Sequence, residues 1–383
     1  MIFQTPSLTD DDRIALDRID ELRRDLRYFL ASKPNRWVGT IRRLLAARAL
    51  RCSNSIEGYN VSVEDALAAI EGGEPAGRAS DDWHAVVGYQ RAMTYVLQLS
   101  EDPHFEYTPQ LLRSLHFMMT EGSDGAGPGL WRPGSIWVSN EVSGDIAYEA
   151  PQATEIPALV SELIDGLSAG IQTPPTVGAA MAHLNLAMIH PFRDGNGRMS
   201  RCLQTLVLAR HGVVAPELCS IEEYLGRNTE SYYAILGEVG RGRWSPTADA
   251  GPWVRYCLAA HYVQGSLVMR RLNEWKVIWE QCEALIRTHR LPPRVVGILC
   301  DAALGLRIRN AQYRTRLERA IGETVSNQVA SRDLHVAVKA GLLVAHGSRR
   351  GTSYSAGPPL AEIRWHLQER RTPIEPSDVF QRR

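Results

Sequence analysis

The amino-acid sequence predicts a mostly α-helical fold that carries a small β-hairpin and is followed by a smaller C-terminal module. Apolar residues recur at helical spacing over most of the chain, whereas strand-like alternation is confined to two places. The helical segments are residues 10–31, 41–57, 81–99, 108–120, 155–169, 177–190, 198–211 and 253–288. The two predicted hairpins pair residues 135–139 with 144–148, and residues 342–345 with 352–354.

The composition is that of a globular protein. The chain has 383 residues, of which 44% are hydrophobic and 22% are charged, and this excludes a disordered protein of low hydropathy. With 43 Lys+Arg against 43 Asp+Glu the net charge is zero, which argues against a chain that coats nucleic acid along its whole length. The basic residues are nearly all arginines, and we attribute this bias to codon usage.

The cysteines and the apolar runs predict a cytoplasmic protein that does not span a membrane. The start of the chain lacks a basic segment followed by an apolar one, and no apolar run approaches the ~18 residues of a membrane span. The cysteines are scattered among apolar neighbours without a C-x-x-C pair, which predicts buried, reduced thiols. They are Cys52, Cys202, Cys219, Cys257, Cys282 and Cys300.

A domain boundary is predicted between Thr288 and Pro293, where the last long helix ends and two prolines open a new pattern. Residues 286–383 hold 17 Lys+Arg and 8 Asp+Glu, a balance of +9, so the preceding part has a balance of −9. The predicted regions are an N-terminal helical region (1–100), a core (101–250), a connecting helix (251–288), a second module (289–360) and a tail (361–383).

The most informative stretch runs from His190 to Arg201. We expect one helix to begin after Thr176 as its N-cap and to end before Pro191. A second helix is expected to start near Arg198 and to stop at Gly212. Between them lies the tight turn 194–197, whose glycines allow backbone N–H groups to approach an anion closely.

The charges around this turn point to a polyphosphate site. Helix N-termini favour acidic side chains, yet this helix opens with Arg198 and Arg201 on one face. Asp194 is a hard oxygen ligand suited to Mg²⁺, and His190 is a titratable base close to the expected anion. The alternative is a plain helix–turn–helix with solvent-facing arginines, but it leaves this dense combination of residues unexplained.

The stretch resembles the signature of the Fic family, H-x-F-x-(D/E)-G-N-G-R-x-x-R, with every defined position filled. The resemblance extends over roughly residues 35–250 and implies a Fic-type helical bundle. Leu112 to His116 resembles the core helix that precedes the motif. The segment 129–132, leading into a target-docking flap with Tyr148 and Pro151, is also similar to the family; the flap residues are Ile136, Trp137 and Val138.

The resemblance implies transfer of AMP from ATP to a Ser, Thr or Tyr hydroxyl of a protein, which could be the chain itself. His190 would act as the base, and Asp194 would hold Mg²⁺. The phosphates would be bound by Gly195, Asn196, Gly197, Arg198 and Arg201. Tyr232 and Tyr233 resemble the segment that closes the adenine pocket, and Arg227 is placed near the nucleotide on resemblance alone.

A second charge anomaly lies at the end of the helix expected at 41–57. Its last residue, Glu57, is an anion at the negative end of the helix, and Ser53 lies on the same face. Taken alone, Glu57 would be an exposed glutamate. The segment resembles the Fic inhibitory motif, (S/T)-x-x-x-E-(G/N), which implies that Glu57 pairs with Arg201 and blocks the γ-phosphate position. The same glutamate could instead position a water that removes AMP.

The C-terminal module resembles a winged helix. Three helices are expected over 293–304, 311–321 and 326–340, followed by a hairpin with its tip at 347–351. Gln328 and Arg332 on the third helix, with Arg349 and Arg350 on the wing, would face DNA. We favour instead a protein-contact or dimerisation module, because the third helix offers few phosphate contacts at Asn327, Ser331 and Asp333.

Two alternatives concern function and one concerns a metal. The rival function is a nucleotide-sensing winged-helix transcription regulator without catalysis, but a pure sensor needs no base at His190. Within the enzyme class, the loop could transfer another phosphate-containing group. His183 shares a helical face with His190, and a core histidine is favoured there over a metal pair because no further ligands follow at matching spacing. Whether the chain forms a homodimer stays open.

Overall fold

The computed structural model describes residues 1–31, 38–75, 80–123, 125–139, 146–170, 173–213, 215, 220–321, 324–347 and 351–381. Cys219, the predicted hairpin residues Gly144 and Asp145, and the predicted wing residues Arg349 and Arg350 lie outside the described residues. The chain divides into two compact units. The larger unit comprises Met1–Pro34, Arg42–Ser266 and Ile374–Arg383, and the smaller unit comprises Asn35–Ile41 and Leu267–Pro373.

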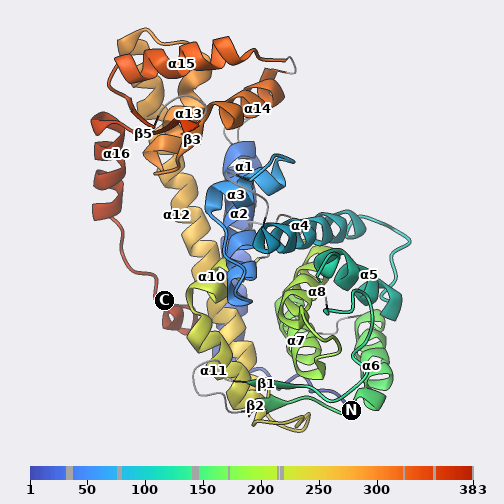
Figure 1. The fold of residues 1–383 in the computed structure, drawn as a ribbon. Coiled ribbons are helices and arrows are strands. Elements are labelled where there is room, and N and C mark those ends of the chain that lie inside the picture. Colours follow the sequence, from blue (N-terminus) through green and yellow to red (C-terminus); the bar gives the residue numbers. More distant parts are fainter. Residues whose placement is uncertain are drawn as a thin grey trace. The chain divides into compact units, whose positions relative to one another are not determined.

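The larger unit is helical, as predicted (Figure 1). The sequence analysis missed three helices of this unit, α3, α10 and α11, which have 8, 6 and 12 residues. The helices described in this unit are α1 (Asp10–Ala31), α2 (Val38–Ile56), α3 (Val63–Ile70), α4 (Asp81–Leu99), α5 (Pro109–Thr120), α6 (Ile156–Ser168), α7 (Pro175–Ile189), α8 (Asn196–Arg210), α10 (Glu222–Arg227), α11 (Thr229–Gly240) and α12 (Gly251–His289), which continues into the smaller unit.

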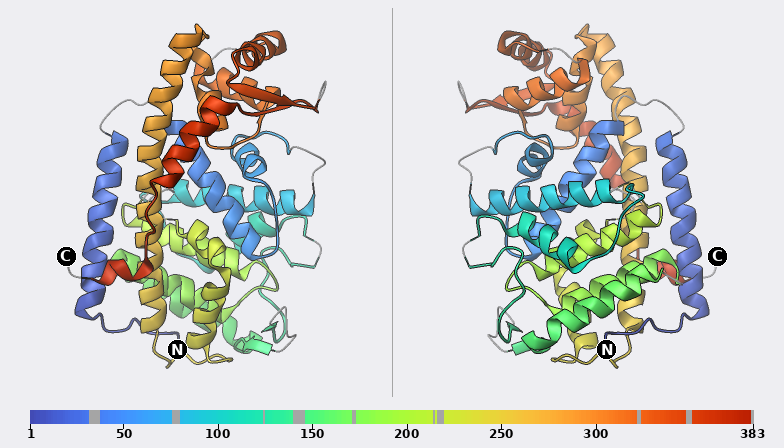
Figure 2. Two further views of the ribbon diagram at one scale, coloured as in Figure 1. Left: turned by 90° about the vertical axis from the view of Figure 1, so that its left-hand side faces the viewer. Right: turned by 90° about the vertical axis from the view of Figure 1, so that its right-hand side faces the viewer.

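Helices α7 and α8 pack against each other at the centre of the larger unit, and nearly every residue of both is buried. A helix that is surrounded by protein on all sides forms the core of its domain. The expectation that Thr176 caps α7 is wrong, because the helix begins at Pro175 and the fixed φ of proline suits a first helical position. The Thr176 hydroxyl instead accepts a hydrogen bond from Arg23 of α1 at 2.8 Å. Figure 2 shows α1 alongside the first part of α12.

The first predicted hairpin is present as an antiparallel pair, β1 (Trp137–Ser139) and β2 (Ile146–Glu149). Val138 pairs with Tyr148, and Trp137 pairs with Glu149. On its other edge β2 is held by the segment after α11, since Glu149 N donates to Gly242 O at 2.9 Å and Trp244 N donates to Glu149 O at 3.0 Å. We call the described residues 134–139 and 146–151 the flap.

The smaller unit contains the C-terminal helices and a three-stranded antiparallel sheet of order β3-β5-β4. Its elements are the short η2 (Pro293–Val295), α13 (Val296–Ala303), β3 (Ile308–Arg309), α14 (Asn310–Ile321), α15 (Asn327–Lys339), β4 (Leu343–His346), β5 (Ser353–Ala356) and α16 (Pro358–Glu369). Three helices followed by a hairpin is the order expected of a winged helix, and that assignment stays a prediction.

The unit boundary differs from the predicted domain boundary. The smaller unit includes Asn35–Ile41, and its main part already begins within α12, at Leu267, because a continuous helix carries no break that a sequence pattern could mark. The expected tail, 361–383, holds most of α16 and the short helix η4 (Pro376–Phe380). Helix η4 belongs to the larger unit, where Val379 is fully buried in the core.

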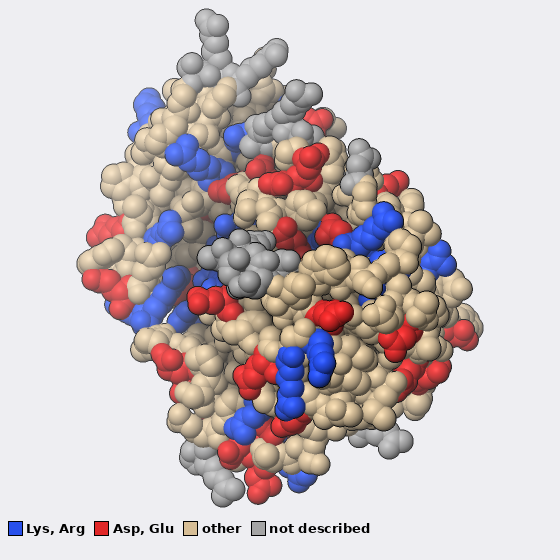
Figure 3. Space-filling model, turned by 60° about the horizontal axis from the view of Figure 1, so that its bottom comes forward, with Lys and Arg blue, Asp and Glu red and all other residues tan. Residues whose placement is uncertain are grey.

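The described cysteines are free and buried, as predicted: Cys52, Cys202, Cys257, Cys282 and Cys300. Within the part of the chain that the structure describes, no helix combines the length and apolarity needed to cross a membrane. Basic and acidic side chains are interspersed over the face seen in Figure 3.

Candidate active site

His190 ends helix α7 in a left-handed backbone conformation, with φ of 51°. A non-glycine residue in this conformation costs about 1–3 kcal/mol and persists only where the surroundings hold it. The imidazole Nδ1 lies 3.1 Å from the Ala187 carbonyl oxygen. A carbonyl can only accept, so Nδ1 carries the proton and the lone pair is on Nε2. Burial lowers the pKa of His190, and neutral imidazole is the form that can accept a proton.

The loop after His190 is closed by Asn196 and supported by His116. The Asn196 amide accepts from Phe192 N and donates to Phe192 O, both at 2.9 Å. The Asn196 side chain therefore faces back into the loop. The phosphate contact that the resemblance implies for Asn196 would then come from its backbone N–H. His116 stacks on Phe192 and, accepting from Gly129 N through Nδ1, donates from Nε2 to Asp194 O at 2.9 Å. Burial lowers the pKa of His116 to about 4.

Two arginines at the start of α8 are buried with unused donors. Arg198 and Arg201 are 0% and 1% exposed. Arg198 Nε and Nη1 and Arg201 Nη1 have no hydrogen-bond acceptor among the described residues. A buried charged donor without an acceptor carries a large desolvation penalty, so the site is suited to an anion with several oxygens. The N-terminus of α8 adds its own backbone N–H groups to the same place.

Glu57 lies against this arginine pair. Its Oε1 accepts from Arg201 Nη2 at 2.8 Å, and Arg201 also donates to the Ser53 hydroxyl at 2.7 Å. Burial opposes the charge of Arg201, but Glu57 outweighs it and the pKa of Arg201 is raised. Gly197 makes the approach feasible, because a Cβ at that position would come within 2.2 Å of Glu57 Oε1. The pairing of Glu57 with Arg201 that the resemblance implies is therefore present, and the Ser53 hydroxyl is a further acceptor for Arg201.

Tyr59 completes this side of the site and was missed by the sequence analysis. Its ring lies under the Arg198 guanidinium, 4.8 Å from the ring centroid, and its hydroxyl donates to Asp194 Oδ2 at 3.4 Å. The chain reaches this position through Gly58, which has φ of 83°. An aromatic residue two positions after Glu57 carries no signal that a sequence pattern would single out.

Asp194 is suited to hold Mg²⁺ only together with a substrate. Its carboxylate is 42% exposed and lies 3.4 Å from Arg198 Nη2. No cluster of three or more His, Cys, Asp or Glu with the geometry of a metal site occurs in the described ranges. Mg²⁺ is commonly bound by one or two carboxylates plus substrate phosphates, and a single carboxylate beside a phosphate site fits that arrangement.

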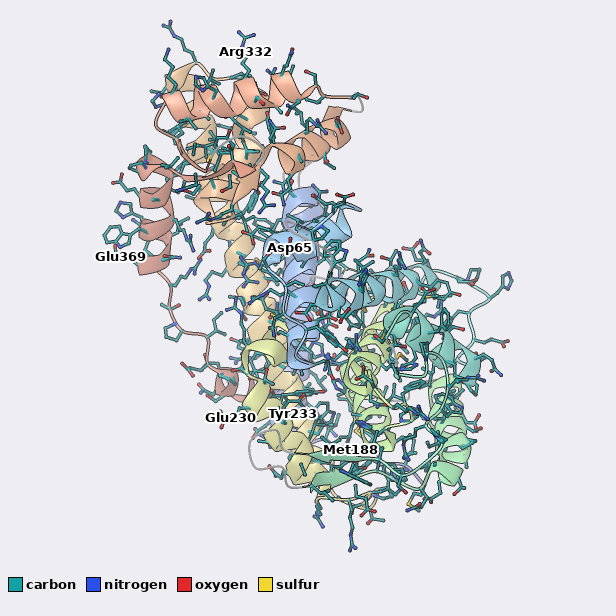
Figure 4. All side chains as sticks on the ribbon, viewed as in Figure 1. Asp65, Met188, Glu230, Tyr233, Arg332 and Glu369 are labelled. Atoms are coloured by element: carbon teal, nitrogen blue, oxygen red, sulfur yellow. The ribbon has the colours of Figure 1, made fainter. Side chains whose placement is uncertain are left out.

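The other predicted nucleotide residues lie in different surroundings. Tyr232 is buried, and its hydroxyl donates to Nε2 of His183 at 2.9 Å. His183 is itself buried, as expected for a core histidine. Tyr233 is 46% exposed and donates to the Ile56 carbonyl oxygen at 3.1 Å, beside Glu57 (Figure 4). Arg227 forms an ion pair with Glu223 at 2.7 Å, and this contact does not bring it to the loop.

The flap is attached to α7 next to the base. The Tyr148 hydroxyl donates to the Met188 carbonyl oxygen at 2.7 Å, two residues before His190 (Figure 4). Trp137 is 55% exposed, whereas Ile136 and Val138 are half-buried against the core. Arg132, directly before the flap, is 3% exposed and donates to the His190 carbonyl oxygen at 2.8 Å. The sequence marks Arg132 only as part of a similar segment, since its burial cannot be read from spacing.

Comparisons with known proteins agree with the geometry. Residues 106–208 match the profile described as the Fic/DOC family, and this segment holds α5, the flap, α7 and the loop. Protein adenylyltransferase fic-1 of Caenorhabditis elegans is 26% identical over 206 residues, which are 53% of this chain and 37% of that protein. Protein adenylyltransferase Fic of Culex quinquefasciatus is 28% identical over 207 residues, covering 53% of this chain and 38% of that protein.

The fold is also found among solved structures. A Fic family protein from Desulfovibrio desulfuricans G20 has a TM-score of 0.56 at 22% identity, covering 93% of this chain and 99% of that one. Fic-1 from C. elegans has a TM-score of 0.53 at 21% identity, covering 68% of this chain and 73% of the other. The predicted Fic-type bundle is thereby confirmed. The chain spans less than two fifths of the length of the curated relatives it matches.

Proposed function

We propose that this chain, which contains a Fic/DOC family domain, is a protein adenylyltransferase held in an inhibited state by Glu57. One observation carries the proposal: Glu57 pairs with Arg201, while other buried N–H groups of Arg201 and Arg198 have no acceptor in the described part of the chain. The site therefore has the donors for a polyphosphate, and the Glu57 carboxylate uses one of those donors in place of a phosphate oxygen. The names of the relatives support AMP as the transferred group.

The proposed chemistry is attack of a protein hydroxyl oxygen on the α-phosphorus of ATP. The hydroxyl proton goes to Nε2 of His190, a new P–O bond forms, and the bond to the β-phosphate oxygen breaks. Pyrophosphate leaves with its charge stabilised by Arg198, Arg201 and the N–H groups of the turn. Asp194 would hold Mg²⁺, whose charge would help to neutralise the phosphates.

Glu57 acts as a brake in this proposal because carboxylate and γ-phosphate require the same donor. Arg201 Nη2 cannot donate a strong hydrogen bond to the carboxylate and to the γ-phosphate at once, and these two anions would repel each other. ATP would then bind with its triphosphate displaced, so that the α-phosphorus is out of line with the attacking hydroxyl. Misplacement of about 1 Å can cost on the order of a hundredfold in rate.

The test compares Glu57→Gly with wild type in Mg²⁺ and ATP labelled at either the α- or the γ-phosphate, followed by mass spectrometry of protein products. We expect α-label on protein to rise at least about tenfold in Glu57→Gly. His190→Ala in the same background should abolish it. Label retained from the γ-phosphate would contradict AMP transfer, and equal labelling of wild type and Glu57→Gly would contradict the brake.

Glu121→Gly is the matched control. Glu121 also follows the end of a helix and precedes a glycine of positive φ, but it is exposed and its ion pair is with Arg91. It should leave labelling at the wild-type level. The same preparations test whether Glu57 serves removal of AMP: release of AMP from a pre-labelled protein by wild type, lost in Glu57→Gly, would assign that reverse activity.

The rival function, nucleotide sensing without catalysis, is less well supported. His190 keeps the Nε2 lone pair while its Nδ1 is bonded to Ala187 O, and a binding pocket needs no such base. ATP binding that survives in Glu57→Gly without any transfer of label would favour the sensor.

Double-stranded DNA is the second candidate ligand, for the smaller unit, and one observation favours it. Asp333 is the only acidic residue between Thr324 and Ala361, yet it is 1% exposed and accepts from Arg294 at 2.7 Å through both oxygens. The Tyr313 hydroxyl donates to it as well. The negative charge of Asp333 is therefore neutralised inside the unit, so it does not repel phosphate at the surface. The exposed side chains of α15 include Gln328 and Arg332 (Figure 4).

The salt dependence of DNA affinity tests this candidate. In the full chain, Arg332→Ala should reduce the slope of log K against log salt by about 1. Arg287→Ala removes the same charge from the last turn of α12 and should leave the slope unchanged. Absence of measurable binding at low salt would leave the protein-contact or dimerisation reading as the function of this unit.

A further inference from the structure

Arg132 makes four backbone hydrogen bonds at the meeting point of the flap and the loop. Its own N–H donates to Pro191 O at 2.9 Å, and its Nε donates to His190 O at 2.8 Å. Nη1 donates to Gly134 O at 2.6 Å, and Nη2 donates to Pro151 O. One side chain thus contacts both ends of the flap and the carbonyl of the proposed base.

This arginine is held in an unusual electrostatic setting. It is 3% exposed, and its hydrogen-bond acceptors are carbonyl oxygens, with no carboxylate partner among the described residues. A buried charge without a counter-ion carries a desolvation penalty of several kcal/mol, which a purely structural contact could avoid with an apolar side chain. Burial accordingly lowers the pKa of Arg132 below its ordinary value.

The place of the contact suggests what the charge does. His190 is in the left-handed conformation, and its carbonyl therefore points away from the direction that a continuing helix would give it. Arg132 Nε binds that carbonyl and so stabilises the strained residue. The two Nη groups hold the residues from which β1 departs and to which β2 returns, which fixes the flap relative to the same carbonyl.

We propose that Arg132 is a positioning residue that holds the flap and the His190 imidazole in a fixed register, so that a hydroxyl presented by the flap meets Nε2. The inference rests on the proposed function for its consequence in catalysis. A planar fork is required, because three acceptors in different directions are reached from one guanidinium. A lysine at this position keeps the charge but offers a single nitrogen.

The activity test uses the full chain in the Glu57→Gly background. Arg132→Lys should lower kcat by about tenfold to a hundredfold while the KM for ATP stays unchanged, because the nucleotide contacts lie elsewhere. Arg210→Lys is the matched control. Arg210 also holds three backbone carbonyls, of Leu99, Ser100 and Asp102, but it sits at the opposite end of α8 from the loop. An equal loss in Arg210→Lys, or an unchanged kcat in Arg132→Lys, would overturn the proposal.

A second readout does not depend on turnover. The His190 imidazole can be titrated by NMR in wild type, Arg132→Lys and Arg132→Met. Burial and the charge of Arg132 lower the pKa of His190, whereas the bond to the Ala187 carbonyl and the charges of Glu57 and Asp194 raise it. We therefore expect the pKa of His190 to rise in Arg132→Met but not in Arg132→Lys, with folding verified by thermal unfolding. An unchanged pKa in a folded Arg132→Met protein would overturn the placement of Arg132 beside the base.

The two readouts separate failure of the inference from failure of the proposed function. If Glu57→Gly with Arg132 intact transfers no AMP, the proposed function fails and the NMR titration alone decides whether Arg132 controls His190. If that parent is active and Arg132→Lys retains its kcat, the function stands and the inference fails.

Discussion

At the scale of single residues, the charges at helix ends were the most informative part of the sequence. Arg198 and Arg201 lie where the helix dipole disfavours them, and Glu57 lies at the opposite kind of helix end. The structure brings Glu57 to Arg201, as the resemblance implied. The roles of His116, Tyr59 and Arg132 were not predictable, because each depends on a hydrogen-bond partner distant in sequence. The inward turn of Asn196 depends on a local bond to Phe192, four residues away, and was also missed.

The buried histidines predict how stability depends on pH. Burial lowers the pKa of His116 to about 4 and that of His183 to about 3, below the ordinary 6.5 of an unfolded chain. As pH falls below 6.5 the unfolded state takes up these protons before the folded state does. Stability should therefore be fully present above that pH and decline by up to about 1.4 kcal/mol per pH unit for each histidine.

Denaturant unfolding between pH 7 and pH 4.5 measures this decline. His183→Gln removes one of the buried histidines and should give a shallower fall, although it lowers stability at neutral pH by breaking the bond to Tyr232. His104→Asn, at an exposed position, should reproduce the wild-type slope. A His183→Gln slope equal to that of wild type would contradict the assignment.

At the scale of elements, the sequence predicted long helices well and short ones poorly. Helices α1 and α4 begin and end at the predicted residues, because each has an acidic first turn and a sustained apolar repeat. Helix α10 has six residues, fewer than two turns, and α16 begins with two prolines at the end of the predicted module and runs on into the expected tail. Helix η4 could not be predicted from its own sequence pattern, because its burial comes from packing within the larger unit.

Helix η4 should therefore contribute to the stability of the larger unit. Val379 is 0% exposed, and Phe380 packs under the Arg255 guanidinium at 4.7 Å. Val379→Asp places an unpaired charge in the core and should lower the free energy of unfolding by at least about 2 kcal/mol. Leu130→Asp, at a position 58% exposed in the same unit, should change it by less than about 0.5 kcal/mol. Chemical denaturation of both variants provides the comparison.

At the scale of the whole molecule, the net charge of zero combines two unlike parts. The acidic balance lies in the segment that holds the candidate site, and the basic balance lies in the last 98 residues, from 286 to 383. That division was visible in the sequence, but the course of the chain between the units was not. The chain leaves the larger unit within α12 and returns to it at Ile374, a path that composition cannot reveal.

The pairing of Glu57 with Arg201 has a consequence for how the protein would respond to its surroundings. A carboxylate on the same chain competes at a constant effective concentration, so diluting or overproducing the protein leaves the inhibited fraction unchanged. If one molecule in about a hundred were open, ATP would bind about a hundredfold more weakly than to the open form. Only a ligand or partner that favours the open form could change that fraction. The proposed switch would thus respond to a ligand or partner that favours the open form, and the amount of the protein would not by itself change its state.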